Sequence, residues 1–451
     1  MATAVGRAGG LAVATAVGRA GGLVVATAVG CLLLTTGCGS PPDDTKTELS
    51  RPVQKAAQAP ASPQLPVPRG TGSDIPDDFN GDGHRDLILN DLVKAQSHAD
   101  DAGIGIVYGG TRGLTPGARQ LLTPERHAAR TLDQLPALFD AEAGCDLDGD
   151  GFTDLVVSTD PPYDGQGRPP VPLQLLFGSP EGLTGKAVKL TVPDRARAGN
   201  DWPDQPVCGD FDGDGAQDLV LHASEEQLSF LRGPFTRKGT PRAAAAPLPA
   251  PGNLPTGPAT DVNQDGYDDL LVRTAEDAGP ATLVLGTATG PTGTRITLPS
   301  GTSVALGRFG GSAALDAAVA TDSGETSLRY DLPTATPATL PDTPGTGLTT
   351  ADFDGDGYDD LVSGSDTGLR VVPGAKAGPA ASAAVTLTPA ARGTSRVLTA
   401  GDFDGDGRAD LVVRTYRGET ADTIALYPGT KGSVIAGSPV LTFSSAEFLP
   451  G

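Results

Sequence analysis

The chain has 451 residues, with 62 glycines, 40 prolines and only 4% aromatic residues. This composition is typical of many short strands joined by Gly and Pro turns, and it excludes a mainly helical protein. The formal net charge is −22. No basic face stands out that would neutralise phosphates, so nucleic acid is excluded as a partner.

Residues 1–37 carry only two charges and end in an apolar run, a pattern that predicts an export signal. Small residues precede Cys38, which resembles the bacterial lipobox, in which this cysteine is diacylated and becomes the mature amino terminus. We therefore predict a lipoprotein-type signal peptide over 1–37 and a lipid anchor on the outer face of the cell membrane. A plain secretory signal, giving a secreted protein, and an uncleaved membrane anchor are the alternatives.

Residues 38–72 are rich in Pro, Ala, Ser and Gln. A stretch of this kind cannot bury enough apolar area to fold, so we expect a disordered tether. The folded part of the chain is then 73–451.

An acidic motif, Asp-x-Asp/Asn-x-Asp-Gly-x-x-Asp-Leu, recurs six times in this folded part. Its copies begin at Asp78, Asp146, Asp210, Asp261, Asp352 and Asp402. The interval between the fourth and fifth starts is about twice the others, and residues 307–316 align there without gaps to 401–410 as a degenerate copy. Seven units of 44–68 residues match the four-stranded blades of a β-propeller, so we predict an all-β, seven-bladed propeller.

The last unit shows the four expected strands most clearly, over 396–403, 409–415, 423–427 and 439–444, with the acidic loop between the first two. In the third unit, a Pro/Ala-rich stretch over 233–258 predicts that the outer strand is poor or missing.

The acidic loops and the glycine turn after each third strand, as in Val107-Tyr108-Gly109 and Tyr427-Pro428-Gly429, occur as a pair. This pairing resembles the FG-GAP/VCBS repeats of integrin α-subunit propellers and their bacterial relatives, over residues 73–445. The resemblance implies a seven-bladed propeller whose loops hold calcium. It leaves the function open, because the family includes adhesion modules, ligand-binding modules and accessory domains.

The ligand chemistry of the loops independently predicts calcium. Carboxylates at positions 1, 3 and 5 of a tight turn point inward, position 7 offers its carbonyl, and the aspartate at position 9 closes an all-oxygen shell. An EF-hand is excluded because position 12 is not Glu but Leu89, Val157 or an equivalent strand residue. We expect about six structural calcium ions. The predicted ligands are Asp78, Asn80, Asp82, His84 and Asp86; Asp146, Asp148, Asp150, Phe152 and Asp154; Asp210, Asp212, Asp214, Ala216 and Asp218; Asp261, Asn263, Asp265, Tyr267 and Asp269; Asp352, Asp354, Asp356, Tyr358 and Asp360; and Asp402, Asp404, Asp406, Arg408 and Asp410.

The degenerate loop has Arg308, Gly310 and Ser312 at the first three ligand positions and keeps only Asp316. We predict that it binds no calcium and that the Arg308 guanidinium pairs with Asp316 in place of the cation.

The first two units are the longest, and their extra length lies in loops expected on the face opposite the acidic loops. Loops presented by a rigid scaffold are the usual place for a ligand site, although solvated insertions are the alternative. The candidate ligand-face residues are Arg126, Arg130, Tyr163, Arg195 and Trp202.

Two cysteines, Cys145 and Cys208, occupy near-equivalent positions before the second and third acidic loops. Export makes a disulfide between them plausible, with two buried free thiols as the alternative.

The sequence contains no nucleophile elbow, zinc-protease motif or phosphate-binding glycine loop, so we identify no catalytic residue. The leading hypothesis is a monomeric binding or adhesion module for a protein or glycan ligand of unknown identity. A propeller-based polysaccharide lyase or hydrolase and a purely structural envelope protein are the alternatives.

Overall fold

The computed structural model describes residues 63–92, 102–197, 199, 202–224, 226–252, 254–274, 279–321, 324–340, 343, 347–365, 368–417 and 420–449. All of them belong to the second of two compact units, 59–451. The predicted signal peptide, Cys38 and most of the predicted tether lie outside these residues. No helix within the described ranges is long and apolar enough to cross a membrane.

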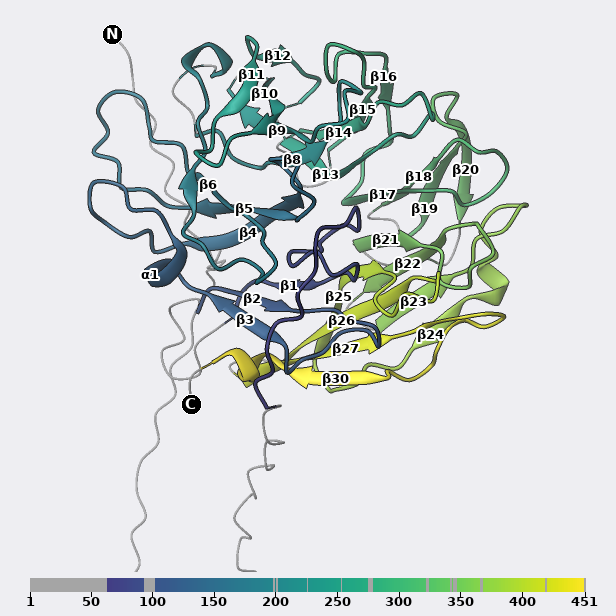
Figure 1. Cartoon of the computed structure of the whole chain (residues 1–451). Coiled ribbons are helices and arrows are strands. Elements are labelled where there is room, and N and C mark those ends of the chain that lie inside the picture. The colour runs from purple at the N-terminus through teal and green to yellow at the C-terminus, as the bar shows by residue number, and fades with distance from the viewer. Residues whose placement is uncertain are drawn as a thin grey trace, which may run out of the picture. The chain divides into compact units, whose positions relative to one another are not determined.

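Seven successive sheets form the blades of a propeller ring (Figure 1). Blade 1 contains β1 (Leu87–Leu89), β2 (Ile104–Val107) and β3 (Arg119–Leu122), and blade 2 contains β4 (Phe139–Cys145), β5 (Asp154–Thr159), β6 (Leu173–Leu176) and β7 (Val188–Lys189). Blade 3 contains β8 (Val207–Gly209), β9 (Asp218–Ala223), β10 (Gln227–Phe235), β11 (Pro241–Ala244) and β12 (Leu248–Pro249). Blade 4 contains β13 (Leu254–Thr260), β14 (Asp269–Arg273), β15 (Ala281–Val284) and β16 (Arg295–Thr297), and blade 5 contains β17 (Ser303–Gly307), β18 (Asp316–Ala320), β19 (Thr326–Tyr330) and β20 (Thr336–Leu340).

Blade 6 contains β21 (Gly347–Ala351), β22 (Asp360–Ser365), β23 (Gly368–Val372) and β24 (Val385–Leu387). Blade 7 contains β25 (Thr394–Gly401), β26 (Asp410–Arg417), β27 (Thr420–Tyr427) and β30 (Leu441–Ser444), with a small hairpin of β28 (Gly429–Thr430) and β29 (Val434–Ile435). In the part of the chain that the structure describes, the helices are four short turns, α1 (Pro124–His127), η1 (Asp194–Ala196), η2 (Ala381–Ala383) and η3 (Ser445–Phe448).

The blades pack against one another through seven apolar clusters, each built from two neighbouring blades. The second strand of a blade is covered on both faces, which is why β5 and β18 are almost continuously buried instead of alternating. The residue at position 2 of each acidic loop, such as Phe211 or Phe353, is fully buried at such an interface. The recurring apolar runs of the sequence therefore build the ring.

The ring closes where blade 7 meets blade 1, and among the described strands none is shared between these two sheets (Figure 1). Apolar side chains that include Leu87 and Phe403 form one cluster there. The buried Arg414 of blade 7 donates from Nη1 to Asn90 O (2.6 Å) and from Nη2 to Asp91 O (2.8 Å). Apolar packing and these bonds hold blades 1 and 7 together.

Three details of the structure can be compared with the predictions from the sequence. The strands of blade 7 begin and end within three residues of their predicted bounds, and the largest difference is at the start of β27. The outer strand of blade 3 is not missing: it is divided into β11 and β12, which both pair with β10. The described end of the predicted tether lies on blade 1, because Leu65 N donates to Gly117 O (2.8 Å) and Gly70 N to Asn80 O (3.0 Å).

Strand register places the two kinds of loop at opposite ends of the blades. In blade 2, Cys145 pairs with Asp154 beside the acidic loop, and Phe139 pairs with Thr159 at the other end. The β5–β6 loop and the β3–β4 connection therefore leave from the end opposite the acidic loop, as predicted.

Candidate metal-binding loops

The first aspartate of each intact loop organises the turn through its carboxylate. In blade 2, Asp146 Oδ1 accepts from Gly149 N (2.8 Å) and Asp150 N (3.1 Å), and Oδ2 accepts from Gly151 N (2.7 Å). Gly151 has φ 85°, a left-handed conformation that strongly favours glycine. In all six intact loops, the first aspartate accepts from the backbone N–H groups of positions 5 and 6.

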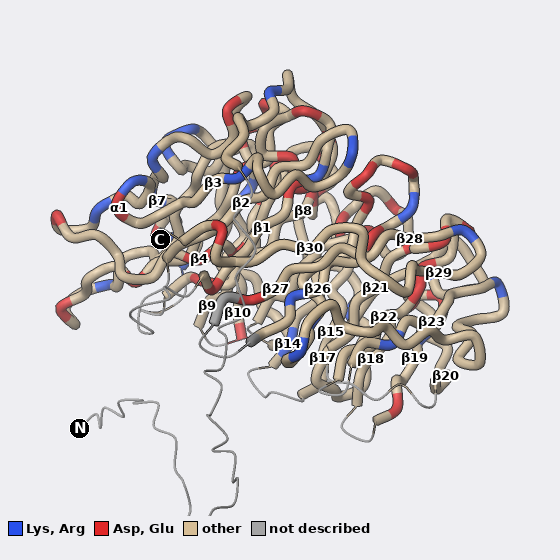
Figure 2. Tube along the Cα trace, turned by 90° about the horizontal axis from the view of Figure 1, so that it is seen from below, with Lys and Arg blue, Asp and Glu red and all other residues tan. Residues whose placement is uncertain are grey.

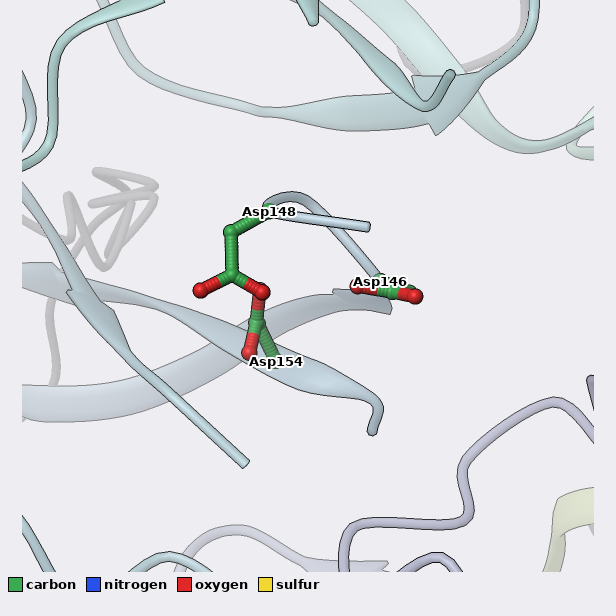
Figure 3. A group of neighbouring side chains, drawn as sticks. All are labelled: Asp146, Asp148 and Asp154. Atoms are coloured by element: carbon green, nitrogen blue, oxygen red, sulfur yellow. The ribbon is translucent and has the colours of Figure 1, made fainter. Parts of the chain in front are cut away.

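Carboxylates gather inside these turns. One oxygen each from Asp146, Asp148 and Asp154 lies within 4.8 Å of the others, and the carboxylates of Asp148 and Asp154 face each other (Figure 3). Among the described residues, blades 3 and 7 group the same three positions, 1, 3 and 9, and blade 6 groups positions 1, 3 and 5. These groups are Asp210, Asp212 and Asp218; Asp352, Asp354 and Asp356; and Asp402, Asp404 and Asp410.

Several oxygens in these loops are buried without a hydrogen-bond donor. They are Asn80 Oδ1, Asp148 Oδ1, Asp212 Oδ1 and Asp218 Oδ2. The side chains of Asp148 and Asp212 are only 9% and 3% exposed, so water does not freely replace the missing donor. Unsatisfied oxygens in an all-oxygen, carboxylate-rich shell fit a hard divalent cation such as calcium.

Proximity and burial also disfavour the ionised form of the ninth-position aspartates. Burial, with the neighbouring carboxylates, raises the pKa of Asp154 to about 8 and the pKa of Asp218 and Asp360 to about 7. Backbone N–H donors oppose this rise but do not cancel it. A bound cation would supply the missing compensation for these charges.

The ninth aspartate has a second role that the sequence analysis missed. Asp154 Oδ2 accepts from Leu147 N (3.0 Å) in its own loop, and Oδ1 accepts from Gly178 N (2.9 Å) in the turn after β6. The equivalent aspartates of blades 1, 4, 6 and 7 make the same two bonds. We call this bridge the aspartate clasp. The glycine turn that accompanies each acidic loop in the sequence was its signal.

The degenerate loop of blade 5 keeps the clasp without the other carboxylates. Asp316 accepts from Phe309 N (2.9 Å), Gly310 N (3.2 Å) and Asp331 N (2.8 Å). The predicted Arg308–Asp316 pair is wrong: Arg308 Nε donates to Ser312 O (3.0 Å) and Nη1 to Gly357 O (3.2 Å), and the guanidinium stacks on Tyr358. Arg308 reaches the next blade because Asp316 is already saturated by backbone donors.

The residue at position 7 of each intact loop donates its backbone N–H to the carboxylate at position 5. These residues are His84, Phe152, Ala216, Tyr267, Tyr358 and Arg408. Their carbonyls as metal ligands stay a prediction.

A disulfide joins Cys145 and Cys208 across the inner strands β4 and β8, with a Cα–Cα distance of 6.3 Å. The predicted pairing is thus present. In several other loops the backbone N–H of position 8 donates to the preceding loop, as from Thr153 N to Asp78 O (3.0 Å) and from Ala409 N to Asp352 O (2.8 Å). Between blades 2 and 3, the disulfide joins the two strands that precede the acidic loops.

On the opposite face, two of the five candidate ligand-face residues come together. Tyr163 and Trp202 pack edge to face with ring centroids 6.0 Å apart. Arg126 in α1 and Arg195 in η1 are exposed, and Arg130 donates to Asp133 O (2.7 Å). Within the described ranges, no hydrogen bond, ion pair or ring contact joins these arginines to the aromatic pair.

Fold and loops together define a seven-bladed β-propeller with acidic loops on one face. Residues 146–221 and 352–413 match the family model described as FG-GAP-like repeat. The chain is thus a seven-bladed β-propeller, and two stretches of it, covering parts of blades 2, 3, 6 and 7, are similar to FG-GAP-like repeats. No curated protein matches it.

Solved structures resemble the chain only distantly. The BBS1N structure in complex with ARL6DN, soaked with mercury, has 15% identity and a TM-score of 0.40 and covers 81% of this chain and 95% of its own. The biofilm matrix protein Bap1 of V. cholerae has 9% identity and a TM-score of 0.34, covering 83% and 92%. AofleA from Arthrobotrys oligospora has 10% identity and a TM-score of 0.35, covering 85% and 95%. At these values, no ligand or partner is transferred to this chain.

Proposed function

We propose that this protein is an exported, membrane-tethered calcium-binding propeller that acts as a binding module for a protein or glycan ligand. The observation that carries the proposal is that the two ends of the strands present different kinds of loop. Acidic loops with unsatisfied buried oxygens occupy one end, and the long loops of blades 1 and 2 occupy the other. Calcium stabilises the scaffold, and the opposite face binds.

The calcium part of the proposal rests on the loop oxygens. Calorimetric titration of the chelator-treated protein should detect about six sites and none in blade 5. Calcium should raise the melting temperature through mass action, because the unfolded chain does not assemble these shells. An unchanged melting temperature in excess chelator would overturn the structural role, and a seventh site would overturn the assignment of blade 5.

The ligand part rests on the edge-to-face pair of Tyr163 and Trp202. Aromatic side chains give large contact area at low entropic cost, and Tyr163 is 38% exposed. We would screen the calcium-loaded protein on a glycan array and against purified envelope proteins. For any ligand found, Trp202→Ala should weaken binding by about 2 kcal/mol or more.

A matched control is Val440→Ala, which shortens a side chain that is 69% exposed in blade 7. It should leave both the affinity and the melting temperature unchanged. Equal affinities for Trp202→Ala and wild type would remove the aromatic pair from the binding face. Turnover of a glycan without stable binding would favour the enzyme alternative.

Export and tethering rest on the sequence before residue 63. The test is Cys38→Ser in the full chain, expressed in a bacterial host with labelled palmitate. The wild type should carry label and partition into the detergent phase, and the variant should do neither. An unlabelled wild type in the aqueous phase would favour free secretion.

A further inference from the structure

Among the described residues, arginines from outside the loop form ion pairs with the carboxylates of two acidic loops. Arg237, in the turn between β10 and β11 of blade 3, crosses to blade 2. Its Nε lies 2.7 Å from Asp148 Oδ2, and its Nη2 contacts Asp150. The guanidinium also lies over the Phe177 ring, 5.2 Å from its centroid. One cation thus contacts the carboxylates of positions 3 and 5.

Blade 3 places two arginines beside its own loop. Arg242 on β11 pairs with Asp214 at position 5, and Arg232 on β10 lies 3.1 Å from Asp212 Oδ2 at position 3. Hydrogen bonding to Arg242 lowers the pKa of Asp214, whereas burial raises the pKa of Asp212. In Figure 2, basic segments lie beside several of the acidic ones.

The loop of blade 6 is the natural comparison. It also has four aspartates, Asp352, Asp354, Asp356 and Asp360, but within the described part of the chain no Arg or Lys forms an ion pair with any of them. Blade 7 is intermediate, because Arg408 of its own loop pairs with Asp406. Arg308 of blade 5 reaches the blade 6 loop, but there it donates to Gly357 O. Loops with the same ligand side chains therefore differ in how many of their carboxylates are ion-paired.

We propose that Arg237 and Arg242 are intramolecular counter-ions that compete with calcium, so that the loops of blades 2 and 3 bind calcium more weakly than the loop of blade 6. This inference rests on the proposed calcium function. Buried oxygens without donors, Asp148 Oδ1 in blade 2 and Asp212 Oδ1 in blade 3, show that the arginines do not saturate these shells.

The competition follows from the chemistry of the guanidinium. It carries only donors, stays charged at any ordinary pH and prefers carboxylate oxygens. Calcium needs the same oxygens, so it must displace the arginine or share the carboxylates at a cost in affinity. When calcium displaces Arg237, it also releases a contact between blades 2 and 3.

The test is hydrogen exchange followed by mass spectrometry during a calcium titration of the full chain. Peptides covering 146–154, 210–218 and 352–360 report the calcium midpoint of each loop separately. In the wild type, the blade 6 peptide should become protected at the lowest calcium concentration. Arg237→Gln should lower the midpoint of the blade 2 peptide alone by about three- to tenfold, and Arg242→Gln should do the same for blade 3.

Arg295→Gln is the matched control, because Arg295 is exposed and, among the described residues, donates to Pro249 O (2.8 Å) and pairs with no acidic loop. It should shift no midpoint. Unchanged blade 2 and blade 3 midpoints in the two test variants would overturn the inference while leaving calcium binding intact. Absence of calcium-dependent protection in all loops would instead overturn the proposed function.

Discussion

Replacing Asp316 with alanine would separate the aspartate clasp from the metal, because blade 5 has the clasp without the other loop carboxylates. Asp316 is fully buried. Its Oδ2 accepts from Phe309 N and Gly310 N, and its Oδ1 accepts from Asp331 N. The substitution leaves these three N–H groups without their acceptor.

The expected cost follows from those bonds. A buried donor left without a partner costs about 1–3 kcal/mol, and removing a buried carboxylate, whose pKa burial raises, returns part of that cost. We therefore expect Asp316→Ala to lower the free energy of unfolding by about 3–5 kcal/mol. Asp316→Asn retains an oxygen for Phe309 and Gly310 and loses only the bond from Asp331, so it should cost about 1–2 kcal/mol.

The assay is urea unfolding of wild type and variants, once in excess chelator and once in saturating calcium. The loss in Asp316→Ala should be the same in both, because the blade 5 loop is predicted to bind no ion. The matched variant, Asp360→Ala in blade 6, removes the same clasp and a predicted calcium ligand, so its loss should be larger in calcium. A calcium-dependent loss in Asp316→Ala, or a loss below about 1 kcal/mol in chelator, would refute this reasoning.

Three further predictions concern the ring as a whole. In the metal-free propeller, the pKa of Asp154 is about 8 and that of Asp360 about 7, against 3.8 as the ordinary value, so the folded state holds these protons more tightly than the unfolded chain. Stability in chelator should therefore fall as the pH rises from about 4 to 8. Over the same range, the increase in melting temperature caused by calcium should become larger. Thermal melts that show the opposite trends would contradict this prediction. Arg414→Met removes the 2.8 Å ion pair of the buried Asp422 and should lower the free energy of unfolding by about 3–5 kcal/mol. Adding Asp422→Leu should restore part of that stability. No recovery in the double variant would exclude the loss of this ion pair as the cause. Replacing Cys145 and Cys208 with serine should cost about 2–4 kcal/mol in urea unfolding, and reducing agent should destabilise the wild type but not this variant.

The blade number could be predicted because the information is local and periodic. Each acidic loop fits within nine residues, and its glycine and carboxylates are dictated by the turn itself. The strands that follow are apolar on both faces because blades stack, and this produces recognisable runs such as Leu155–Val157. The degenerate copy at 308–316 was found only from the regular spacing of the other copies, and β17 and β18 lie on either side of it.

The role of Asp316 could not be predicted, because its partners are distant in sequence or belong to the backbone. Asp331 N, the partner from the turn after β19, is 15 residues away. The sequence shows that an aspartate survives in a loop that has lost its other ligands, and a charged partner was the natural explanation. The backbone supplies the partners instead, which accounts for why the ninth position alone was retained.

The same limit explains why the arginines were missed. Arg237 and Arg242 lie in the Pro/Ala-rich stretch that was expected to lack a good outer strand, and only the pairing of β11 with β10 directs them toward the acidic loops. Arg232, Arg237 and Arg242 follow one another at intervals of five residues in a chain that is otherwise strongly acidic, and that spacing was the available signal. Counting motif carboxylates makes the loops of blades 2, 3, 6 and 7 equal, since each has four aspartates. The loops become unequal when the arginines that the fold brings to their carboxylates are also counted. Calcium affinity depends on the number of carboxylates left without such a partner.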